Sequence, residues 1–374
     1  MQGDQKIRIL ECIRQGQIGG GESHLLSLVE NLDRSEFEPI VLSFTDGPMI
    51  ERLRELGVET KVIHTLKPFD ITKWKQVKRF ISEKQVDIIH AHGTRAASNV
   101  LWTSRSLQLP LIYTIHGWSF HEDQSLLVKK IRVMGEKYLT RKSDLNISVS
   151  VSNQQSGKKY IPSFQSIVVN NGIDITKFNS ENKFKDIRVE FGIAPEKILL
   201  LFIARFTFQK QPLSLIKAFK EASLVNPDLH LLMVGDGEQK AEAEMIIRQE
   251  DLENKITLVP FRQDVPDILA AADIYLLPSL WEGLPIGLLE AMAMGKTIIA
   301  SNVDGTREII EHMQNGFLVN TGNLIPELIQ AIDQLSKNPD QREQFGEKAK
   351  MTVRNRFNAS KMTKEIESLY RDLI

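Results

Sequence analysis

Residues 6–13 of the chain read KIRILECI, residues 19–21 are three glycines, and residues 23–32 read SHLLSLVENL. The first stretch predicts a buried strand, and the glycines that follow it predict a tight loop. Apolar residues in the third stretch recur at the spacing of one helix face, at Leu25, Leu28, Val29 and Leu32. This order of strand, loop and helix predicts the repeating unit of an α/β fold.

The same unit recurs in two series along the chain. In the first series, further strands are expected at residues 38–44, 59–64, 86–92, 109–116, 143–150 and 166–170. A second series follows the polar segment FNSENKFKD, at residues 197–204, 228–235, 255–260, 272–278, 296–301 and 316–320. Strands that alternate with helices in this way predict parallel sheets covered by helices on both faces.

Two domains are expected, because 374 residues exceed what one hydrophobic core usually organises. The polar stretch at residues 172–185 places the boundary, so that residues 1–175 and 176–357 each form a doubly wound, Rossmann-like domain. Residues 358–374 end the chain with an amphipathic helix. Ligands of such sheets bind outside the carboxyl ends of the strands, so a cleft between the domains is the expected site.

Composition excludes several classes of protein. The net charge of -1 excludes a strongly basic nucleic-acid binder, and Cys12, the single cysteine, excludes an intrachain disulfide and a thiolate metal cage. The beginning, MQGDQKIRIL, lacks the basic and apolar regions of a secretory signal, and no stretch reaches the roughly 18 apolar residues of a membrane span. These features predict a cytoplasmic protein.

The loop after the expected strand at residues 197–204 carries two cations. Arg205 ends this strand, and Lys210 follows five residues later. A guanidinium and an ammonium group together can neutralise a diphosphate whose charge grows as a glycosidic bond breaks. The alternative is that both are solvated surface charges.

Two carboxylates lie in or just before the expected helix at residues 285–294. Pro285 is expected at the first helical position and Gly295 at the left-handed stop, so the helix is short. Glu282 precedes the helix and Glu290 lies in its second turn, amid apolar residues that are costly for a carboxylate without a partner. We expect both to contact a ligand near the helix N-terminus, where the amides of Ile286 and Gly287 are free to meet an anion. A solvated helix face is the alternative.

Glycines and histidines complete the candidates. Gly19 and Gly20 could let backbone amides approach an anion, or could simply form a turn. His116 ends a strand at the expected cleft edge. His90 and His92 fall on one face of a strand, but no third metal ligand is evident, so we assign them a structural role.

Taken together, several motifs resemble glycosyltransferase family 4. They are GGGESHLLSLVENL, HAHG, TIHG, NNGID, ARFTFQK, GDGE and EGLPIGLLEAMAMGK, and they span almost the whole chain. The resemblance implies the GT-B architecture, in which the C-terminal domain holds a nucleotide-sugar donor, the N-terminal domain holds the acceptor, and the last helix crosses back to the N-terminal domain.

The resemblance also implies roles for individual residues. Arg205 and Lys210 would bind the diphosphate, Glu282 the transferred sugar and Glu290 the ribose hydroxyls. In the first domain, Gly20 would offer an amide to the phosphate from the loop that begins at Gly19, and His116 would lie beside the sugar. Further donor contacts would come from the following residues: Gly235, Val259, Gly283, Leu284, Ile286 and Gly287.

The family resembled here retains the anomeric configuration and requires no metal or other cofactor. The chain has no Asp-x-Asp spacing that would bind a divalent ion. Leu284-Pro285 replaces the Phe-Gly of some mannosyltransferases, which favours a UDP-sugar over GDP-mannose. The expected function is therefore transfer of a hexose or N-acetylhexosamine from a UDP-sugar to a glycan or lipid-linked saccharide, in cell-surface polysaccharide or glycolipid synthesis.

Two segments could also bring the enzyme to an anionic membrane. Residues 67–84 place Ile71, Trp74, Val77 and Ile81 on one side of a helix that carries several lysines, and residues 125–134 contain Lys129, Lys130 and Arg132 among apolar residues. The alternative for the first is an ordinary helix packed on the sheet. Two other functions remain open: a nucleotide-sugar epimerase of the same architecture, and a non-catalytic protein that binds nucleotide-sugars.

Overall fold

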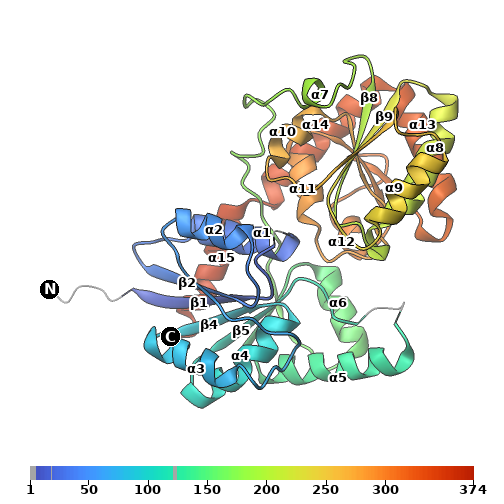
Figure 1. Ribbon diagram of the computed structural model, residues 1–374. Coiled ribbons are helices and arrows are strands. Elements are labelled where there is room, and N and C mark those ends of the chain that lie inside the picture. Colours follow the sequence, from blue (N-terminus) through green and yellow to red (C-terminus); the bar gives the residue numbers. More distant parts are fainter. Residues whose placement is uncertain (1–5, 18, 121–123) are drawn as a thin grey trace. The chain divides into compact units, whose positions relative to one another are not determined.

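The computed structural model describes residues 6–17, 19–120 and 124–374. The expectation about a secretory signal rests partly on residues 1–5, which lie outside the described residues. The chain divides into two compact α/β units, of which unit 1 comprises Met1–Gly172 with Ala359–Ile374 and unit 2 comprises Ile173–Asn358. The sequence placed these limits at 175/176 and 357/358. Figure 1 shows that helices flank the sheet of each unit.

Unit 1 is built on a seven-stranded sheet in the order β3-β2-β1-β4-β5-β6-β7, and all pairings are parallel. Its strands are β1 (Ile7–Ile13), β2 (Phe37–Ser43), β3 (Glu59–Val62), β4 (Ile88–His92), β5 (Leu111–Ile115), β6 (Leu145–Ser148) and β7 (Ile167–Val168). The strand order reverses between β1 and β4, which is a point where parallel sheets bind ligands.

Helices cover both faces of this sheet because apolar side chains of β1 point alternately to each side. Ile9 and Ile13 pack toward α1, α2 and α15, whereas Leu10 and Cys12 pack toward α3 and α4 (Figure 1). The helices of unit 1 are α1 (Gly20–Asn31), α2 (Pro48–Glu55), α3 (Trp74–Glu83), α4 (Thr94–Leu107), α5 (Leu126–Lys142), α6 (Val151–Tyr160) and α15 (Ala359–Arg371).

The last helix, α15, belongs to unit 1 although all of unit 2 precedes it in the sequence. Its apolar stripe, Met362, Ile366 and Tyr370, is buried against β1 and α1. The Tyr370 hydroxyl donates to Glu11 Oε1 at 2.7 Å and lies 2.7 Å from His90 Nδ1. The chain therefore closes unit 1 with both a hydrophobic contact and a buried polar one.

Unit 2 is built on a six-stranded sheet in the order β10-β9-β8-β11-β12-β13, again with parallel pairings. Its strands are β8 (Ile198–Ile203), β9 (Leu229–Val234), β10 (Ile256–Val259), β11 (Ile274–Leu277), β12 (Thr297–Ser301) and β13 (Phe317–Val319). The order of the first six strands of unit 1 is repeated, so both units are doubly wound as the sequence predicted.

In unit 2, α8, α9 and α13 cover one face of the sheet and α10, α11 and α14 the other (Figure 1). The helices and short 3-10 turns of unit 2 are α7 (Ile187–Glu190), η1 (Phe208–Lys210), α8 (Pro212–Val225), α9 (Lys240–Gln249), α10 (Val265–Ala271), α11 (Ile286–Ala293), α12 (Asp304–Arg307), η2 (Thr321–Asn323), α13 (Leu324–Lys337) and α14 (Pro339–Arg356). None of the helices in the described parts of the chain is long and apolar enough to cross a bilayer.

Tyr370→Phe is expected to lower the free energy of unfolding of unit 1 by about 3 kcal/mol, because buried Glu11 and His90 lose a shared hydrogen-bond partner. Urea unfolding followed by tryptophan fluorescence measures this, since Trp74, Trp102 and Trp118 all belong to unit 1. Tyr138→Phe, on half-exposed Tyr138, is the matched control. Equal effects of the two substitutions would contradict the buried hydrogen bonds.

Candidate active site

The loops that carry the predicted cations and carboxylates adjoin in unit 2. The strand order reverses between β8 and β11, which are neighbours in the sheet although β9 and β10 separate them in sequence. Arg205 follows β8, and Glu282 follows β11. Because ligands of open parallel sheets bind outside the carboxyl ends at such a point, these loops form the candidate site of unit 2.

Direct contacts hold the two loops together. The Leu280 amide donates to the Gln209 carbonyl at 2.8 Å, and the Gln209 side chain donates to the Trp281 carbonyl at 2.7 Å. Lys210 Nζ forms an ion pair with Glu282, and the two side chains are only 16% and 7% exposed. The structure thus brings Lys210 and Glu282 together, as the sequence predicted, and largely shields both side chains from water.

Arg205 differs from Lys210 in having no protein partner. Its side chain is exposed, and no hydrogen bond or ion pair joins it to any of the described residues. A guanidinium offers several donors in a planar fork that matches phosphate oxygens. Arg205 is therefore free to bind an anion, and it begins the loop that carries Lys210.

Glu290 lies on helix α11, which follows the loop that carries Glu282. The helix begins at Ile286, because Pro285 is extended at φ -73 and ψ 114; the prediction that Pro285 is its first residue is wrong by one position. The amides of Leu288 and Leu289 donate to the Pro285 carbonyl, which leaves those of Ile286 and Gly287 without an acceptor among the described residues. Gly295 has φ +68 and ends the helix as predicted.

The carboxyl of Glu290 has a pKa far from its usual value. Desolvation raises the pKa of its carboxyl to about 7, and Lys177 lowers it only in part. No hydrogen bond or ion pair to the side-chain carboxyl of Glu290 occurs within the described parts of the chain. A partly buried carboxylate without a partner is costly, and such groups concentrate where a ligand supplies the missing contacts.

Gly235 marks a close approach of two loops on the other side of β8. Its φ is +143, and an added Cβ would lie 2.1 Å from the Ala204 carbonyl oxygen, so only glycine fits. The Gly235 amide donates to the Val259 carbonyl at 3.0 Å. The structure therefore joins the ends of β8, β9 and β10 at two of the positions that the family resemblance proposed for donor contacts.

In unit 1, Gly19 and Gly20 form the N-terminus of α1. Gly19 is the residue before the helix and Gly20 the first residue in it. A Cβ at Gly20 would meet nothing within 4 Å, whereas one at Gly21 would lie 3.5 Å from His116 Cδ2. The helix N-terminus is open at Gly20, and His116 lies immediately beside it.

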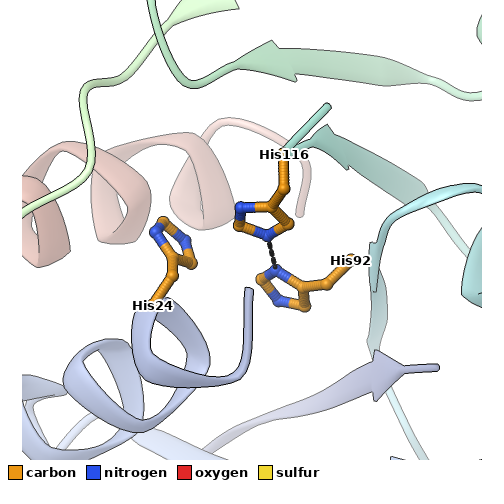
Figure 2. Close-up of side chains that lie close together, drawn as sticks. All are labelled: His24, His92 and His116. Carbon is orange, nitrogen blue, oxygen red and sulfur yellow. Dashed lines mark hydrogen bonds between the residues drawn. The ribbon is translucent and has the colours of Figure 1, made fainter. Parts of the chain in front are cut away.

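His116 belongs to a cluster of histidines from three elements, α1, β4 and the end of β5. Figure 2 shows that the rings of His24, His92 and His116 face one another, with a hydrogen bond of 3.0 Å between His92 Nδ1 and His116 Nε2. His24 Nδ1 lies 3.0 Å from Asn171 Oδ1. The sequence pointed to His116 as a site residue and gave His92 a structural role, whereas the structure places His92 and His24 beside His116.

The hydrogen bonds of this cluster assign the positions of its protons. His92 Nε2 lies 2.8 Å from Glu11 Oε2, so it carries the proton and donates to the carboxylate. His92 Nδ1 is then an acceptor, and His116 Nε2 donates to it. The remaining nitrogen, His116 Nδ1, keeps a lone pair and has no partner among the described residues. The chain from Glu11 through His92 thus presents His116 as a hydrogen-bond acceptor.

Burial keeps these rings neutral. Desolvation lowers the pKa of His92 to about 4 and that of His116 well below its usual value. Burial opposes the charge of Glu11, but His90 and His92 outweigh it by attraction and hydrogen bonds and hold the pKa of Glu11 well below its usual range. One carboxylate charge is therefore buried at the base of the cluster and stabilised by its neighbours.

The sequence found no third metal ligand beside His90 and His92, and the structure corrects this. Ligand atoms of His24, His92 and His116 lie within 4.8 Å of one another, as do those of Glu11, His90 and His92. These are the described residues that could hold a transition metal. In the second trio, His90 already bonds Tyr370 and Thr114, and Glu11 bonds Tyr370 and His92, so that trio is a satisfied structural network.

Glu11 is the member of the cluster that sequence reasoning missed although a signal existed. It lies in the middle of the apolar strand KIRILECI. The argument that singled out Glu290, a carboxylate in an apolar setting, applies equally to Glu11. His24 and Asn171 carried no comparable signal, because only the folded chain places them beside His116 and each other.

The chain has two α/β units, each built on a parallel sheet, and unit 2 carries two cations and two carboxylates on the loops and helix near its strand reversal. This fold and this set of residues are those of a GT-B glycosyltransferase. The sequence model described as Glycosyltransferase Family 4 matches residues 18–177, and the one described as Glycosyl transferases group 1 matches residues 183–352. The chain belongs to glycosyltransferase family 4.

Similar proteins span nearly the full length of the chain. The UDP-Gal:alpha-D-GlcNAc-diphosphoundecaprenol alpha-1,3-galactosyltransferase of Escherichia coli is 26% identical, covering 99% of this chain and 98% of its own. The N-acetyl-alpha-D-glucosaminyl L-malate synthase of Bacillus anthracis is 24% identical over 86% and 84%. The crystal structure of Anabaena HepE in complex with UDP-glucose is 24% identical, with a TM-score of 0.87 over 98% and 100% of the chains.

Glu290→Gln is expected to change the pH dependence of stability. The folded carboxyl, with its pKa of about 7, binds its proton more tightly than the unfolded one, so wild-type stability is full below the unfolded value and falls as pH rises toward 7. The substitution removes this loss. Relative to wild type, the variant should therefore gain about 2 kcal/mol of unfolding free energy between pH 5 and pH 8.

Urea unfolding followed by circular dichroism at both pH values measures this gain. Glu253→Gln, at an exposed position of unit 2, is the control and should follow the wild type. A Glu290→Gln variant whose stability relative to wild type does not change with pH would show that the carboxylate already has a protein partner.

Proposed function

We propose that the enzyme transfers a hexose or N-acetylhexosamine from a UDP-sugar to a glycan or lipid-linked saccharide, with retention of anomeric configuration and without a metal, in polysaccharide or glycolipid synthesis. The observation that carries the proposal is the charge arrangement where β8 and β11 adjoin. There Arg205, an exposed guanidinium without a partner among the described residues, begins the loop whose Lys210 forms a largely buried ion pair with Glu282. A diphosphate-linked sugar supplies the anion for the first and the hydroxyls for the second.

Each group has a distinct task in this proposal. Arg205 and Lys210 bind the diphosphate and stabilise the negative charge that develops on it as the glycosidic bond breaks. Glu282 accepts hydrogen bonds from the transferred sugar. Glu290 accepts them from the ribose, which explains why a carboxylate without a protein partner is kept in a desolvated setting.

The groups of unit 1 complete the proposed set. The Gly20 amide, at the open N-terminus of α1, donates to a phosphate oxygen. His116 Nδ1 accepts a hydrogen bond from a hydroxyl of the transferred sugar, since the Glu11–His92 chain fixes its tautomer. The backbone near Gly235 and Val259 frames the base, and Gly283 and Leu284 complete the loop around Glu282.

Transfer follows from this arrangement without a protein nucleophile. The acceptor oxygen attacks the anomeric carbon from the face that the diphosphate leaves, the bond between this carbon and the phosphate oxygen breaks, and the leaving oxygen takes the acceptor proton. Charge therefore develops on the phosphate, next to Arg205 and Lys210, which are the groups that catalysis by charge stabilisation requires.

Two similar proteins support the choice of donor and acceptor. The Escherichia coli relative is named for UDP-galactose and for an acceptor carried on diphosphoundecaprenol, and HepE is described in complex with UDP-glucose. Both names favour UDP as the nucleotide. The first also favours a lipid-linked saccharide as acceptor.

We expect UDP-sugars, and not GDP-mannose, to raise the melting temperature of the protein, because a ligand that binds only the folded state stabilises it. Glu290→Gln should weaken this shift. Arg205→Gln should keep the fold, since Arg205 has no partner among the described residues, yet lower kcat by about a hundredfold through the lost charge. Arg248→Gln, on the exposed surface of α9, is the control.

Turnover with the stabilising donor then separates the parts of the proposal. Activity that EDTA leaves unchanged, and a product whose anomeric signal by NMR matches that of the donor, are the expected results. An altered sugar formed from donor alone would identify an epimerase. Tight donor binding without turnover on any saccharide acceptor would identify a binding protein. A normal kcat for Arg205→Gln would refute the assigned site.

Gly20→Ala tests the proposed phosphate contact in unit 1. The added methyl group meets no atom within 4 Å, so the melting temperature should stay unchanged. The methyl group would nevertheless occupy the space beside the helix N-terminus and lower kcat/KM by about tenfold or more. Gly322→Ala, at an equally open position of unit 2, is the control. Unchanged kcat/KM in Gly20→Ala would remove Gly20 from the site.

A further inference from the structure

The outer face of α5 is unusually apolar for a surface helix. Four side chains spaced four, three and four residues apart form one stripe, namely Leu127, Ile131, Met134 and Tyr138, and they are 69%, 60%, 63% and 50% exposed. Leu126 and Val128 are exposed as well. Exposed apolar residues are normal singly, but a continuous stripe along one helix face marks an interaction surface.

The inner face of α5 fixes which residues point outward. Glu136 accepts hydrogen bonds from the hydroxyls of Tyr113 at 2.8 Å and Thr94 at 2.7 Å, and Leu139 is buried in the core beside it. Because this carboxylate is fully buried and held by two partners, the helix cannot rotate to bury its apolar stripe without breaking them. The stripe is therefore permanently exposed in unit 1.

Cations flank the stripe on both sides. The sequence of α5 contains six basic residues and one acidic residue, the buried Glu136. Lys129 and Arg132, which the sequence proposed for this role, instead contact Tyr160 and the Ser119 carbonyl. At helical spacing, Lys130 and Lys137 lie along one edge of the stripe and Lys142 along the other, and all three are exposed.

A neighbouring loop adds further apolar groups. The ring of Phe69 lies 6.2 Å from that of Tyr138, so the loop between β3 and α3 lies against the C-terminal half of α5. In this loop Leu66 is 90% exposed and Ile71 is 68% exposed. The exposed apolar surface thus continues from the helix onto a second element of the same unit.

The helical part of the other segment that the sequence proposed for membrane contact, α3, does not share these properties. Val77 and Ile81 of α3 are buried in the core, and Trp74 stacks on Trp102 of α4 with ring centroids 5.8 Å apart. Helix α3 is therefore an ordinary helix packed on the sheet. This was the alternative given for residues 67–84.

We infer that α5 docks unit 1 on the surface of an anionic lipid bilayer. A straight apolar stripe flanked by cations fits a flat hydrophobic layer covered by negative headgroups, and helices of this kind lie in the plane of the interface. With 17 residues, α5 is about 25 Å long and presents the whole stripe to such a surface. A second copy of the chain fits less well, because a symmetric contact would bring the same cations together.

The inference goes beyond glycosyl transfer and places the enzyme where a lipid-linked acceptor would be found. It is tested without donor or acceptor, so its failure and that of the proposed function are distinguishable. We expect the full chain to co-sediment with vesicles of phosphatidylglycerol and phosphatidylcholine, to be released by salt, and to stay in solution with vesicles of phosphatidylcholine alone.

Two double variants separate the apolar and charged contributions. Leu127→Ser/Ile131→Ser and Lys130→Gln/Lys137→Gln should each weaken vesicle binding by about tenfold or more, since all four side chains point outward. The matched controls remove equally exposed groups elsewhere: Leu224→Ser/Val225→Ser on α8 and Lys361→Gln/Lys364→Gln on α15. These should bind as the wild type does.

Three results would overturn the inference. One is wild-type protein that stays in solution with anionic vesicles at low salt. Another is a control variant that loses as much binding as its α5 counterpart. The third is a wild-type dimer, seen by light scattering without lipid, that Leu127→Ser/Ile131→Ser converts to a monomer, because a second copy would then cover the stripe. Circular dichroism melting curves that match the wild type verify that each variant is folded.

Discussion

The parallel pairing of β8 with β11 is the constraint on which the candidate site of unit 2 depends. Every strand of this sheet runs in the same direction, so all strand-to-helix loops leave from one edge. At the reversal of strand order, the loops after β8 and β11 leave in opposite directions along the sheet and open a space between their first residues. Lys210 and Glu282 meet, and Arg205 begins the loop that carries Lys210, because the backbone hydrogen bonds of two neighbouring strands fix where these loops begin.

Each unit contains a carboxylate that burial removes from water, and the effect of burial on its pKa differs between the two units. In unit 1, Glu11 is fully buried but satisfied by Tyr370, His90 and His92, so its charge stabilises the fold and orders the cluster. In unit 2, the carboxyl of Glu290 is desolvated and has no such set of partners, so burial raises its pKa. A buried carboxylate that accepts hydrogen bonds from the protein has a structural role. A desolvated carboxylate without such bonds, at a strand reversal, is a candidate for binding a ligand.

Helices α3 and α5 show how similar sequence patterns lead to different surfaces. Both mix lysines with apolar residues at helical spacing, and both were candidates for membrane contact. Helix α3 turns its apolar side toward the sheet, so polar side chains such as Lys75, Gln76 and Arg79 face solvent. Helix α5 instead uses a buried glutamate, Glu136, as its inner anchor, which leaves its apolar stripe outside. The two helices therefore differ in which face packs against the core, the apolar face in α3 and the face of Glu136 in α5.

By itself, the sequence determined the two doubly wound units, the loops that carry Arg205, Lys210 and Glu282, and the short helix that ends at Gly295. Strand periodicity, glycine positions and charged residues in apolar settings are local signals, and a single stretch of chain displays them. Only the tertiary structure decided that Glu11, His24, His92 and His116 meet, and which face of α5 is exposed. These features depend on contacts between residues far apart in the chain, and no local pattern records which distant side chain will fill the space beside a given residue.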